Sequence, residues 1–424
     1  MFEGDTITAI STPVGTGGIG IIRISGEGAF NIASRIYKGK KNFELINKHT
    51  INYGRIVDPH SGNTLDEVLL AKMRKPNTFT REDVVEIHCH GGTTVLKGIL
   101  ELVVKEGARL AEPGEFTKRA FLNGRIDLSQ AEAVIDLINA KTTESSRAAL
   151  DQLEGKLSLK LKEIRSKLIE LIAHIEVTVD YPEHDIEEIT GQKVYEEISA
   201  VNSMLENLAQ SFEKGRIVRE GLKVVIIGRP NVGKSSLLNE LSGKNRAIVT
   251  DIPGTTRDII EEYININGIP VRIVDTAGIR ETEDPVEKIG VEKAEKALEK
   301  ADLIVLMVDA SQGIDENYRI ITRKAVDKKV ILVINKTDLV DESILNHIEK
   351  EAGIPGSIRM SLKEGKGIDE LESKITHLFV RDEVRANNEF LVTNVRHKSL
   401  LDKAIYSIKN ACAAYECGIP IDCI

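Results

Sequence analysis

The chain has 424 residues, of which 41% are hydrophobic, 29% charged and 4% aromatic, with no tryptophan. Its 57 basic and 66 acidic side chains give a net charge of −9, which disfavours nucleic-acid binding over the whole surface but not at a local basic patch. This composition excludes a disordered, collagen-like or disulfide-framed small protein, and the length favours two to four domains. No apolar run reaches the roughly 18 residues of a membrane helix. Because the N-terminus lacks a signal-peptide pattern and the four cysteines fit a reducing compartment, we expect a cytoplasmic protein without membrane contact.

Residues 1–118 predict a mixed α+β domain. Apolar runs of strand length alternate here with one helical pattern, over residues 96–104, which Gly107 ends. The expected strands cover residues 6–10, 19–24, 68–73 and 84–87.

Residues 119–220 predict the first part of a helical domain. Apolar residues recur at spacings of 4 and 3 over residues 157–175 and again over residues 194–212, which is typical of two amphipathic helices with narrow seams. Pro182 predicts a stop between them. Packing of these helices within one chain is favoured over an intermolecular coiled coil, since neither run covers many heptads.

Residues 221–380 alternate between strands and helices, which predicts an inserted, doubly wound, mainly parallel sheet. After it, residues 381–424 return to the helical period at residues 401–415 and predict the second part of the helical domain. The expected strands of the inserted domain cover residues 224–227, 271–274, 303–308, 330–334 and 357–360.

A phosphate-binding loop is the strongest motif. Residues 228–235, GRPNVGKS, match G-x-x-x-x-G-K-[ST] between a predicted strand and a predicted helix. The glycines allow a tight cradle of backbone N–H groups, and the helix N-terminus adds positive potential. In this motif Lys234 reaches the β- and γ-phosphates, and Ser235 ligates Mg²⁺.

Two further motifs follow later strands in the order typical of a GTPase. Asp275, in the DTAG sequence at residues 275–278, suits the Mg²⁺ shell, and Gly278 suits a close approach to the γ-phosphate. Asp338, in the NKTD sequence at residues 335–338, can accept hydrogen bonds from guanine N1–H and the exocyclic amine, which adenine cannot donate.

Thr256, in the Thr-rich loop at residues 247–258, is our candidate for sensing the γ-phosphate through Mg²⁺. The expected GTP-binding residues are Asn231, Val232, Gly233, Lys234, Ser235, Ser236, Thr250, Asp251, Ile252, Pro253, Gly254, Thr255, Thr256, Asp275, Thr276, Ala277, Gly278, Asn335, Lys336 and Asp338.

The position after the DTAG sequence holds Ile279, where small regulatory GTPases carry a water-orienting glutamine. Because isoleucine cannot orient water by hydrogen bonding, the catalytic group is expected elsewhere. The stretch that follows is acidic and offers Glu281, Glu283, Asp284 and Glu287, any of which also suits a solvated helix start.

From residue 5 to the end, the chain resembles the MnmE (TrmE) family of tRNA-wobble-uridine modification GTPases. The resemblance rests on long strings such as residues 111–125, AEPGEFTKRAFLNGR, and the phosphate loop. It implies an N-terminal folate-binding and dimerising domain, and a discontinuous helical domain with an inserted GTPase domain. It also implies that the homodimer joins a flavin-dependent partner, MnmG (GidA), in a heterotetramer. Together they add an aminomethyl or carboxymethylaminomethyl group to C5 of the wobble uridine (U34) in certain tRNAs.

Site residues follow from the same resemblance. It implies a K⁺ site at Asn231, Thr250, Ile252 and Thr255, which stabilises charge where other GTPases use an arginine finger and forms when two GTPase domains pair. It assigns the water-orienting role to Glu287. A 5,10-methylene- or formyl-tetrahydrofolate derivative is expected to contact Arg23, Glu86 and Arg125, since arginine pairs a glutamate tail and a carboxylate bonds the donor edge of a pterin.

Two departures from the family stand out. Family members end in a Cys-x-Gly-Lys tail; residues 418–422 match a segment upstream of it, so we expect the chain to lack the last few tens of residues. Cys423 is then not the functional cysteine. Residues 361–363, Ser-Leu-Lys, replace the usual Ser-Ala-x beside the guanine, where recognition is mainly through backbone, so GTP binding is expected to survive.

Three functional hypotheses stay open at this point. The first is a K⁺-dependent GTPase of wobble-uridine modification. The second is a ribosome-assembly or RNA-chaperone GTPase switch, which the absence of a basic or KH-like C-terminal module disfavours. The third is a scaffold for the flavoprotein that lacks modification activity because the cysteine tail is absent.

Overall fold

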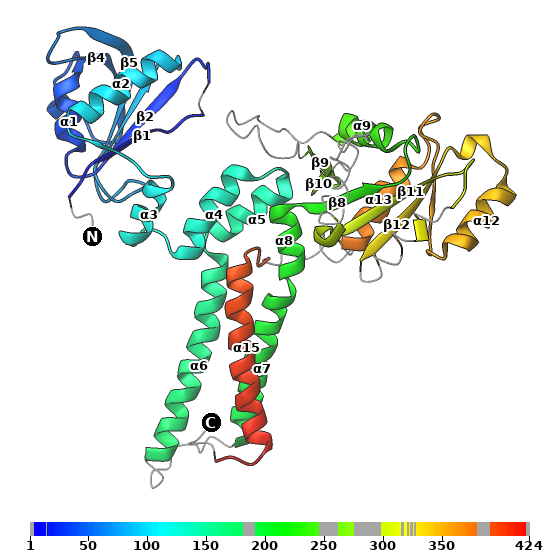
Figure 1. The fold of residues 1–424 in the computed structure, drawn as a ribbon. Coiled ribbons are helices and arrows are strands. Elements are labelled where there is room, and N and C mark those ends of the chain that lie inside the picture. The colour runs from blue at the N-terminus through cyan, green and yellow to red at the C-terminus, as the bar shows by residue number, and fades with distance from the viewer. Residues whose placement is uncertain are drawn as a thin grey trace, which may run out of the picture. The chain divides into compact units, whose positions relative to one another are not determined.

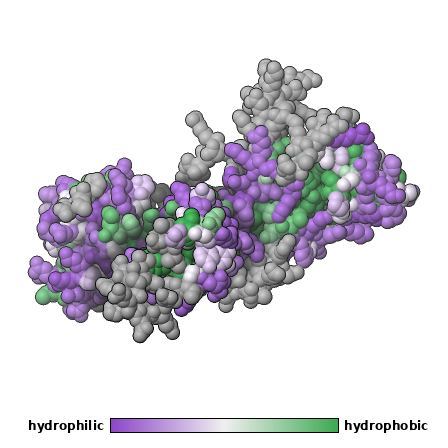
Figure 2. Space-filling view, turned by 90° about the horizontal axis from the view of Figure 1, so that it is seen from below, coloured by the Kyte–Doolittle hydropathy of each residue, from purple (hydrophilic) through white to green (hydrophobic). Residues whose placement is uncertain are grey.

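The computed structural model divides into two compact units, Met1–Val134 and Ile135–Ile424. On the face seen in Figure 2, hydrophilic residues (purple) predominate, and hydrophobic residues (green) reach the surface between them. In the part of the chain that the structure describes, no helix is both long and apolar enough to cross a bilayer. The described residues are 4–13, 15–180, 191–245, 262–274, 298–314, 318–319, 322, 325, 328–379 and 391–420.

The first unit is built on a seven-stranded sheet with the strand order β3-β4-β5-β6-β2-β1-β7 (Figure 1). Neighbouring strands are antiparallel except β1 and β7, which are parallel. The four strands expected from the sequence correspond to β1, β2, β5 and β6. The strands are β1 (Ile7–Ile10), β2 (Gly20–Ser25), β3 (Tyr37–Gly39), β4 (Thr50–Val57), β5 (Thr64–Met73), β6 (Val84–Cys89) and β7 (Arg109–Leu110).

Strand β4 was not predicted, because Gly54 interrupts its apolar pattern. The glycine is required by packing: a Cβ at residue 54 would lie 2.4 Å from Cε2 of Tyr37. The ring of Tyr37 on β3 therefore covers the backbone of β4, and its hydroxyl donates to the carbonyl of Tyr53 at 2.8 Å.

Helices α1 (Ala29–Ile36) and α2 (Thr93–Lys105) cover one face of this sheet, and the short 3₁₀ turn Phe43–Leu45 packs at its edge. Alternate strand residues such as Ile22 and Ile24 point into this core and are fully buried. On the opposite face, over β4 and β5, Ile51, Tyr53 and Leu69 are 62%, 56% and 44% exposed.

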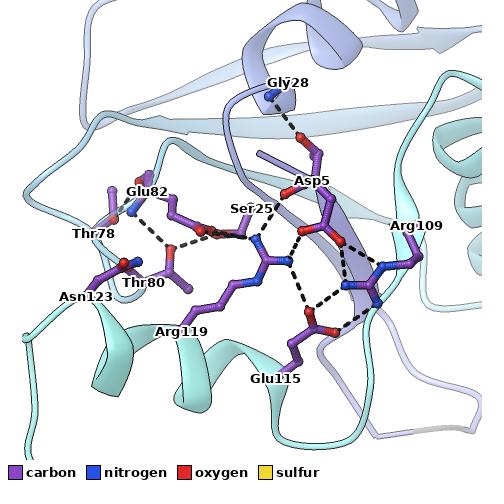
Figure 3. A network of polar contacts seen from close by, with 11 residues as sticks. Asp5, Ser25, Gly28, Thr78, Thr80, Glu82, Arg109, Glu115, Arg119 and Asn123 are labelled. Atoms are coloured by element: carbon purple, nitrogen blue, oxygen red, sulfur yellow. Dashed lines mark hydrogen bonds and ion pairs between the residues drawn. The ribbon is translucent and has the colours of Figure 1, made fainter. Parts of the chain in front are cut away.

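Helix α3 (Glu115–Leu122) is fixed to the first unit by a network of ion pairs (Figure 3). Arg109 pairs with Asp5 and Glu115, each at 2.7 Å. Arg119 pairs with the same two carboxylates at 2.5 and 3.0 Å and with Glu82 at 3.1 Å. The hydrogen bond from Arg109 and the neighbouring charges lower the pKa of the Glu115 carboxyl from 4.5 to about 2.

The second unit begins with helices, as the apolar seams predict. Helix α7 packs against α6 and α15 (Figure 1). Residues of all three helices, including Leu157, Val201 and Leu401, share one core. The two parts of the helical domain, far apart in sequence, therefore pack together within the chain. These helices are α4 (Leu128–Asn139), which begins in the first unit, α5 (Thr143–Leu153), α6 (Lys156–Asp180), α7 (Gly191–Gln210), α8 (Phe212–Glu220) and α15 (Val395–Glu416).

One detail of the helical prediction was wrong. The second seam was expected to run unbroken to Phe212, but α7 ends at Gln210 and α8 begins at Phe212. Ser211 stands at the break; its hydroxyl donates to the carbonyl of Leu208 and accepts from the backbone N–H of Val392 at 3.0 Å. The predicted stop at Pro182 lies outside the described residues.

The remainder of the second unit is a six-stranded sheet in the order β13-β12-β11-β8-β10-β9. All pairs are parallel except β9 and β10, an antiparallel hairpin. Helices α9 and α13 pack on one face and α12 on the other, which confirms the doubly wound prediction. The elements are β8 (Leu222–Ile227), α9 (Lys234–Asn245), β9 (Glu262–Ile266), β10 (Ile269–Val274), β11 (Leu303–Asp309), β12 (Lys329–Asn335), the 3₁₀ turn Thr337–Leu339, α12 (Glu342–Ala352), β13 (Ile358–Arg359) and α13 (Ile368–Phe379).

Candidate nucleotide-binding site

The phosphate loop connects the central strand β8 to the N-terminus of α9. Within it Asn231 and Gly233 have positive φ values of 62° and 105°, which turn the backbone into a tight loop. The Lys234 amine donates to the carbonyls of Gly228 and Arg229 at 2.7 and 2.8 Å, so it lies across the loop. Ser235 and Ser236 are exposed in the first turn of α9, where the helix N-terminus favours an anion. These five predicted residues thus lie together in the loop and the first turn of α9.

A second loop, after β12, lies against the first. The side-chain amide of Asn335 donates to the carbonyl of Val232 at 2.7 Å, and its oxygen accepts from the backbone N–H of Leu362 at 3.3 Å. One buried side chain therefore ties together the phosphate loop and the loop that follows β13. The hydroxyl of Ser361 donates to Asp338 at 2.8 Å and orients that carboxylate.

The Ser-Leu-Lys sequence at residues 361–363, which differs from the Ser-Ala-x of the family, fits between these loops. Leu362 uses its backbone N–H on Asn335, and its side chain packs against the sheet core. Ser361 is the hydrogen-bond partner of Asp338, a role that was not predicted from the sequence. The signal that could have found it is its position two residues after β13, since the carboxyl ends of parallel strands meet at one edge of the sheet.

Gly233→Ala is expected to weaken nucleotide binding by tenfold or more without unfolding the chain. Its Cβ would lie 2.4 Å from the amide nitrogen of Asn335, and φ is +105°, which L side chains rarely adopt. Titration with a fluorescent GDP analogue measures the effect. Gly243→Ala in α9, where no atom lies within 4 Å, is the matched control and should bind normally. Equal affinity of both variants would contradict the role given to the Asn335 contact.

Many predicted residues lie outside the described part of the chain. They are Thr250, Asp251, Ile252, Pro253, Gly254, Thr255, Thr256, Asp275, Thr276, Ala277, Gly278, Ile279, Glu287 and Cys423.

The residues expected to contact folate lie in the first unit. Arg23 on β2 stands opposite Glu86 on β6, and their side chains form an ion pair at 2.7 Å. A carboxylate oxygen of Glu86 also lies 3.4 Å from Nε2 of His88. The Arg23 guanidinium lies 5.5 Å from the ring centre of Phe116 on α3. Arg23 and Glu86, both predicted to contact folate, therefore lie side by side and form an ion pair with each other.

Arg125 follows α3 and has different partners. Its guanidinium donates to the carbonyl of Thr78 at 2.7 Å and lies 5.1 Å from the ring centre of Phe79. The structure thus places Arg125 against the loop between β5 and β6, and not in the Arg23–Glu86 pair.

A strand–loop–helix phosphate-loop motif beside an Asn-Lys-Thr-Asp loop is the arrangement typical of a P-loop GTP hydrolase, a class that works with Mg²⁺. Family models for the "GTP-binding protein TrmE N-terminus" and the "MnmE helical domain" match residues 6–125 and 128–424. The chain belongs to the MnmE family of tRNA modification GTPases.

Two relatives and one solved structure illustrate what the chain is similar to. The tRNA modification GTPase MnmE of Acetivibrio thermocellus is 68% identical over 424 residues, which are 100% of this chain and 92% of that protein. The MnmE of Clostridioides difficile is 53% identical with the same coverage. A crystal structure of a point variant of Aquifex aeolicus Era, bound to GDP and AlF₄⁻, is 35% identical over 36% of this chain and 55% of that chain, with a TM-score of 0.30.

Proposed function

We propose that this chain couples K⁺-dependent GTP hydrolysis to modification of C5 of the wobble uridine in certain tRNAs, together with a flavin-dependent partner of the MnmG type. The observation that carries the proposal is the pair of hydrogen bonds that Asn335 forms with Val232 and Leu362, in a chain of this family. They join the phosphate loop to residues 335–338, the guanine loop, in one site. The product is an aminomethyl or carboxymethylaminomethyl uridine.

The cations of hydrolysis are assigned to the phosphate loop and the segment after α9. Ser235 and Thr256 would hold Mg²⁺, and the exposed Ser235 hydroxyl suits that hard cation. Asn231, with Thr250, Ile252 and Thr255, would hold K⁺. In support, Asn231 is exposed at the turn of the loop. K⁺ supplies positive charge beside the phosphates, and Glu287 orients the attacking water.

A tetrahydrofolate derivative is proposed as the source of the one-carbon unit, with Arg23, Glu86 and Arg125 as its contacts. The pairing of Arg23 with Glu86 supports a polar site on the sheet, because a folate carboxylate can replace Glu86 as the partner of Arg23. Glu86 is then released to accept from the pterin.

A homodimer through the first unit is also part of the proposal. The open sheet face over β4 and β5 carries the exposed apolar side chains of Ile51, Tyr53 and Leu69. Such a patch is typical of a surface that another protein covers, and a second copy of the chain is the partner proposed here.

Glu287→Ala is expected to lower kcat for GTP hydrolysis in KCl by about 10²- to 10³-fold, the size of a lost general base or water-orienting group. Wild type should turn over at least tenfold faster in KCl than in NaCl at equal ionic strength. In cells that carry only this chain, tRNA should hold the C5 modification, and the variant should lose it.

Glu281→Ala is the control for the acidic stretch and should keep the K⁺ effect. Equal slow rates in both salts would contradict the cation site. If the wild type hydrolyses GTP but tRNA from cells that carry only this chain lacks the C5 modification, the scaffold hypothesis is favoured instead.

A further inference from the structure

Asp309, the last residue of β11, forms an ion pair with Lys336 of the guanine loop. Its side chain is only 1% exposed, and its Oδ2 accepts from the Lys336 amine at 2.6 Å. The other oxygen, Oδ1, accepts from the backbone N–H and the hydroxyl of Ser311 at 2.9 and 2.6 Å. The carboxylate is thus fixed on one side, and its remaining oxygen faces the lysine.

The sheet register explains this contact. Asp309 stands directly opposite Asn335 in the parallel pair of β11 and β12. Lys336, the next residue, has a φ of 63°, which turns the chain at the end of the strand. The backbone N–H of Ala310 also donates to the carbonyl of Asn335 at 2.9 Å. The ends of the two strands are therefore locked together at the residue before the lysine.

We propose that Asp309 is a positioning residue for guanine nucleotides, which holds Lys336 in the conformation that receives the nucleotide. This inference rests on the proposed assignment of residues 335–338 to guanine. A lysine side chain has four rotatable bonds, and ordering it on binding would cost affinity. Because Asp309 orders the side chain in advance, that cost is removed, and this corresponds to about a tenfold change in Kd.

A purely structural role for the carboxylate is the competing explanation. The turn after β11 is held by the backbone carbonyl of Asp309, which accepts from the N–H groups of Gln312 and Gly313 at 3.0 Å. That turn needs only one side-chain oxygen, for Ser311. The second oxygen contributes nothing to the turn, and its bond to Lys336 is the contact that the proposal uses.

The test is a double-mutant cycle on nucleotide affinity. Kd for a fluorescent GDP analogue is measured for wild type, Asp309→Asn, Lys336→Ala and the double variant. Asparagine keeps the size of the side chain and still accepts from Ser311. With Lys336 present, Asp309→Asn is expected to raise Kd about tenfold, mainly through faster dissociation. With Lys336→Ala, the same change is expected to alter Kd by less than twofold.

Equal effects of Asp309→Asn in both backgrounds, or no effect in either, would overturn the proposal. Ser311→Ala, which leaves the ion pair in place, should stay within twofold of wild type, and a tenfold loss there would favour the structural explanation. If Asp309→Asn fails to fold, the cycle is repeated with Asp309→Glu, whose shifted carboxylate should raise Kd severalfold only when Lys336 is present.

The wild-type titration separates this inference from the assignment beneath it. If wild type binds the GDP analogue no better than an ADP analogue, the guanine loop itself is wrongly assigned, and the inference falls with it. If wild type prefers guanine and the cycle is additive, only the role of Asp309 is refuted.

Discussion

Asp338→Asn is expected to lower the affinity for GDP about a hundredfold or more, with the fold unchanged. The wild-type carboxylate, oriented by Ser361, can accept from two guanine donors, whereas an asparagine amide directs its own N–H group at the guanine amine. A site built to hydrogen-bond such donors discriminates by several orders of magnitude against a ligand that leaves its polar groups unpaired. Xanthine nucleotides carry an oxygen in place of that amine, so the variant should bind a xanthosine diphosphate analogue better than wild type does.

Fluorescence titration with both analogues checks this exchange of specificity. Asp341→Asn is the matched control, because Asp341 lies three residues further on, is exposed and makes no side-chain cap to α12. Its affinities should stay at the wild-type values. If Asp338→Asn loses affinity for both nucleotides to the same extent, the residue supports the loop without reading the base.

Glu115→Gln is expected to destabilise the first unit by about 3 kcal/mol at pH 7. The Glu115 side chain is 5% exposed and accepts from both Arg109 and Arg119 (Figure 3). Arg109 and Arg119 keep Asp5, and Arg119 keeps Glu82, but each loses its bond to a buried carboxylate. Hydrogen bonds to charged groups contribute about 1.5 to 3 kcal/mol each. Hydrogen exchange of the β1 and β2 amides in the full chain, measured at increasing urea, isolates the stability of this unit.

The same substitution should change how the free energy of unfolding depends on pH in the acidic range. Because the pKa of Glu115 falls from 4.5 to about 2 on folding, its contribution is complete above pH 4.5 and is lost as the pH falls toward 2. At about 1.4 kcal/mol for each pKa unit, this contribution is about 3 kcal/mol. The difference between wild type and Glu115→Gln should therefore shrink between pH 4.5 and pH 2.

Glu101→Gln is the control for this pair of measurements. Its side chain is 67% exposed and lies 3.8 Å from Lys97, so its loss should change stability by less than about 0.5 kcal/mol. A Glu115→Gln variant as stable as this control would mean that Asp5 and Glu82 satisfy the two arginines without Glu115. The network would then be a surface arrangement with little effect on the fold.

Local patterns were sufficient to predict the long helices and the phosphate loop. The spacing of Leu157 and its successors fixed the buried side of α6, and the glycines of residues 228–233 predicted a loop between a strand and a helix. Strand β9 was missed although Asn267 and Gly268, which form its turn to β10, are a hairpin signal. Its apolar residues were too few to outweigh the polar ones between them.

Contacts between distant residues could not be predicted in the same way. Arg23 and Glu86 were each expected near a ligand, but their ion pair follows from the register of β2 and β6, which no local spacing encodes. Asp309 was missed for the same reason: it looks like the end of an apolar strand until the neighbouring strand brings Lys336 to it. Asp338 was predicted because its motif is continuous in sequence, whereas its partner Ser361 follows a different strand.

The packing of α15 against α7 has a consequence for biosynthesis. A ribosome completes α7 before residues 221–394 and α15 only after them, so this bundle cannot close until the inserted domain has been translated. Bringing the two helices together across an unfolded segment of that length would cost considerable chain entropy. A folded insert would shorten the free length of chain between the two helices and so lower that cost. At its start, α8 leads through Gly221 directly into β8. We therefore expect the nucleotide-binding domain to fold before the bundle closes around α15.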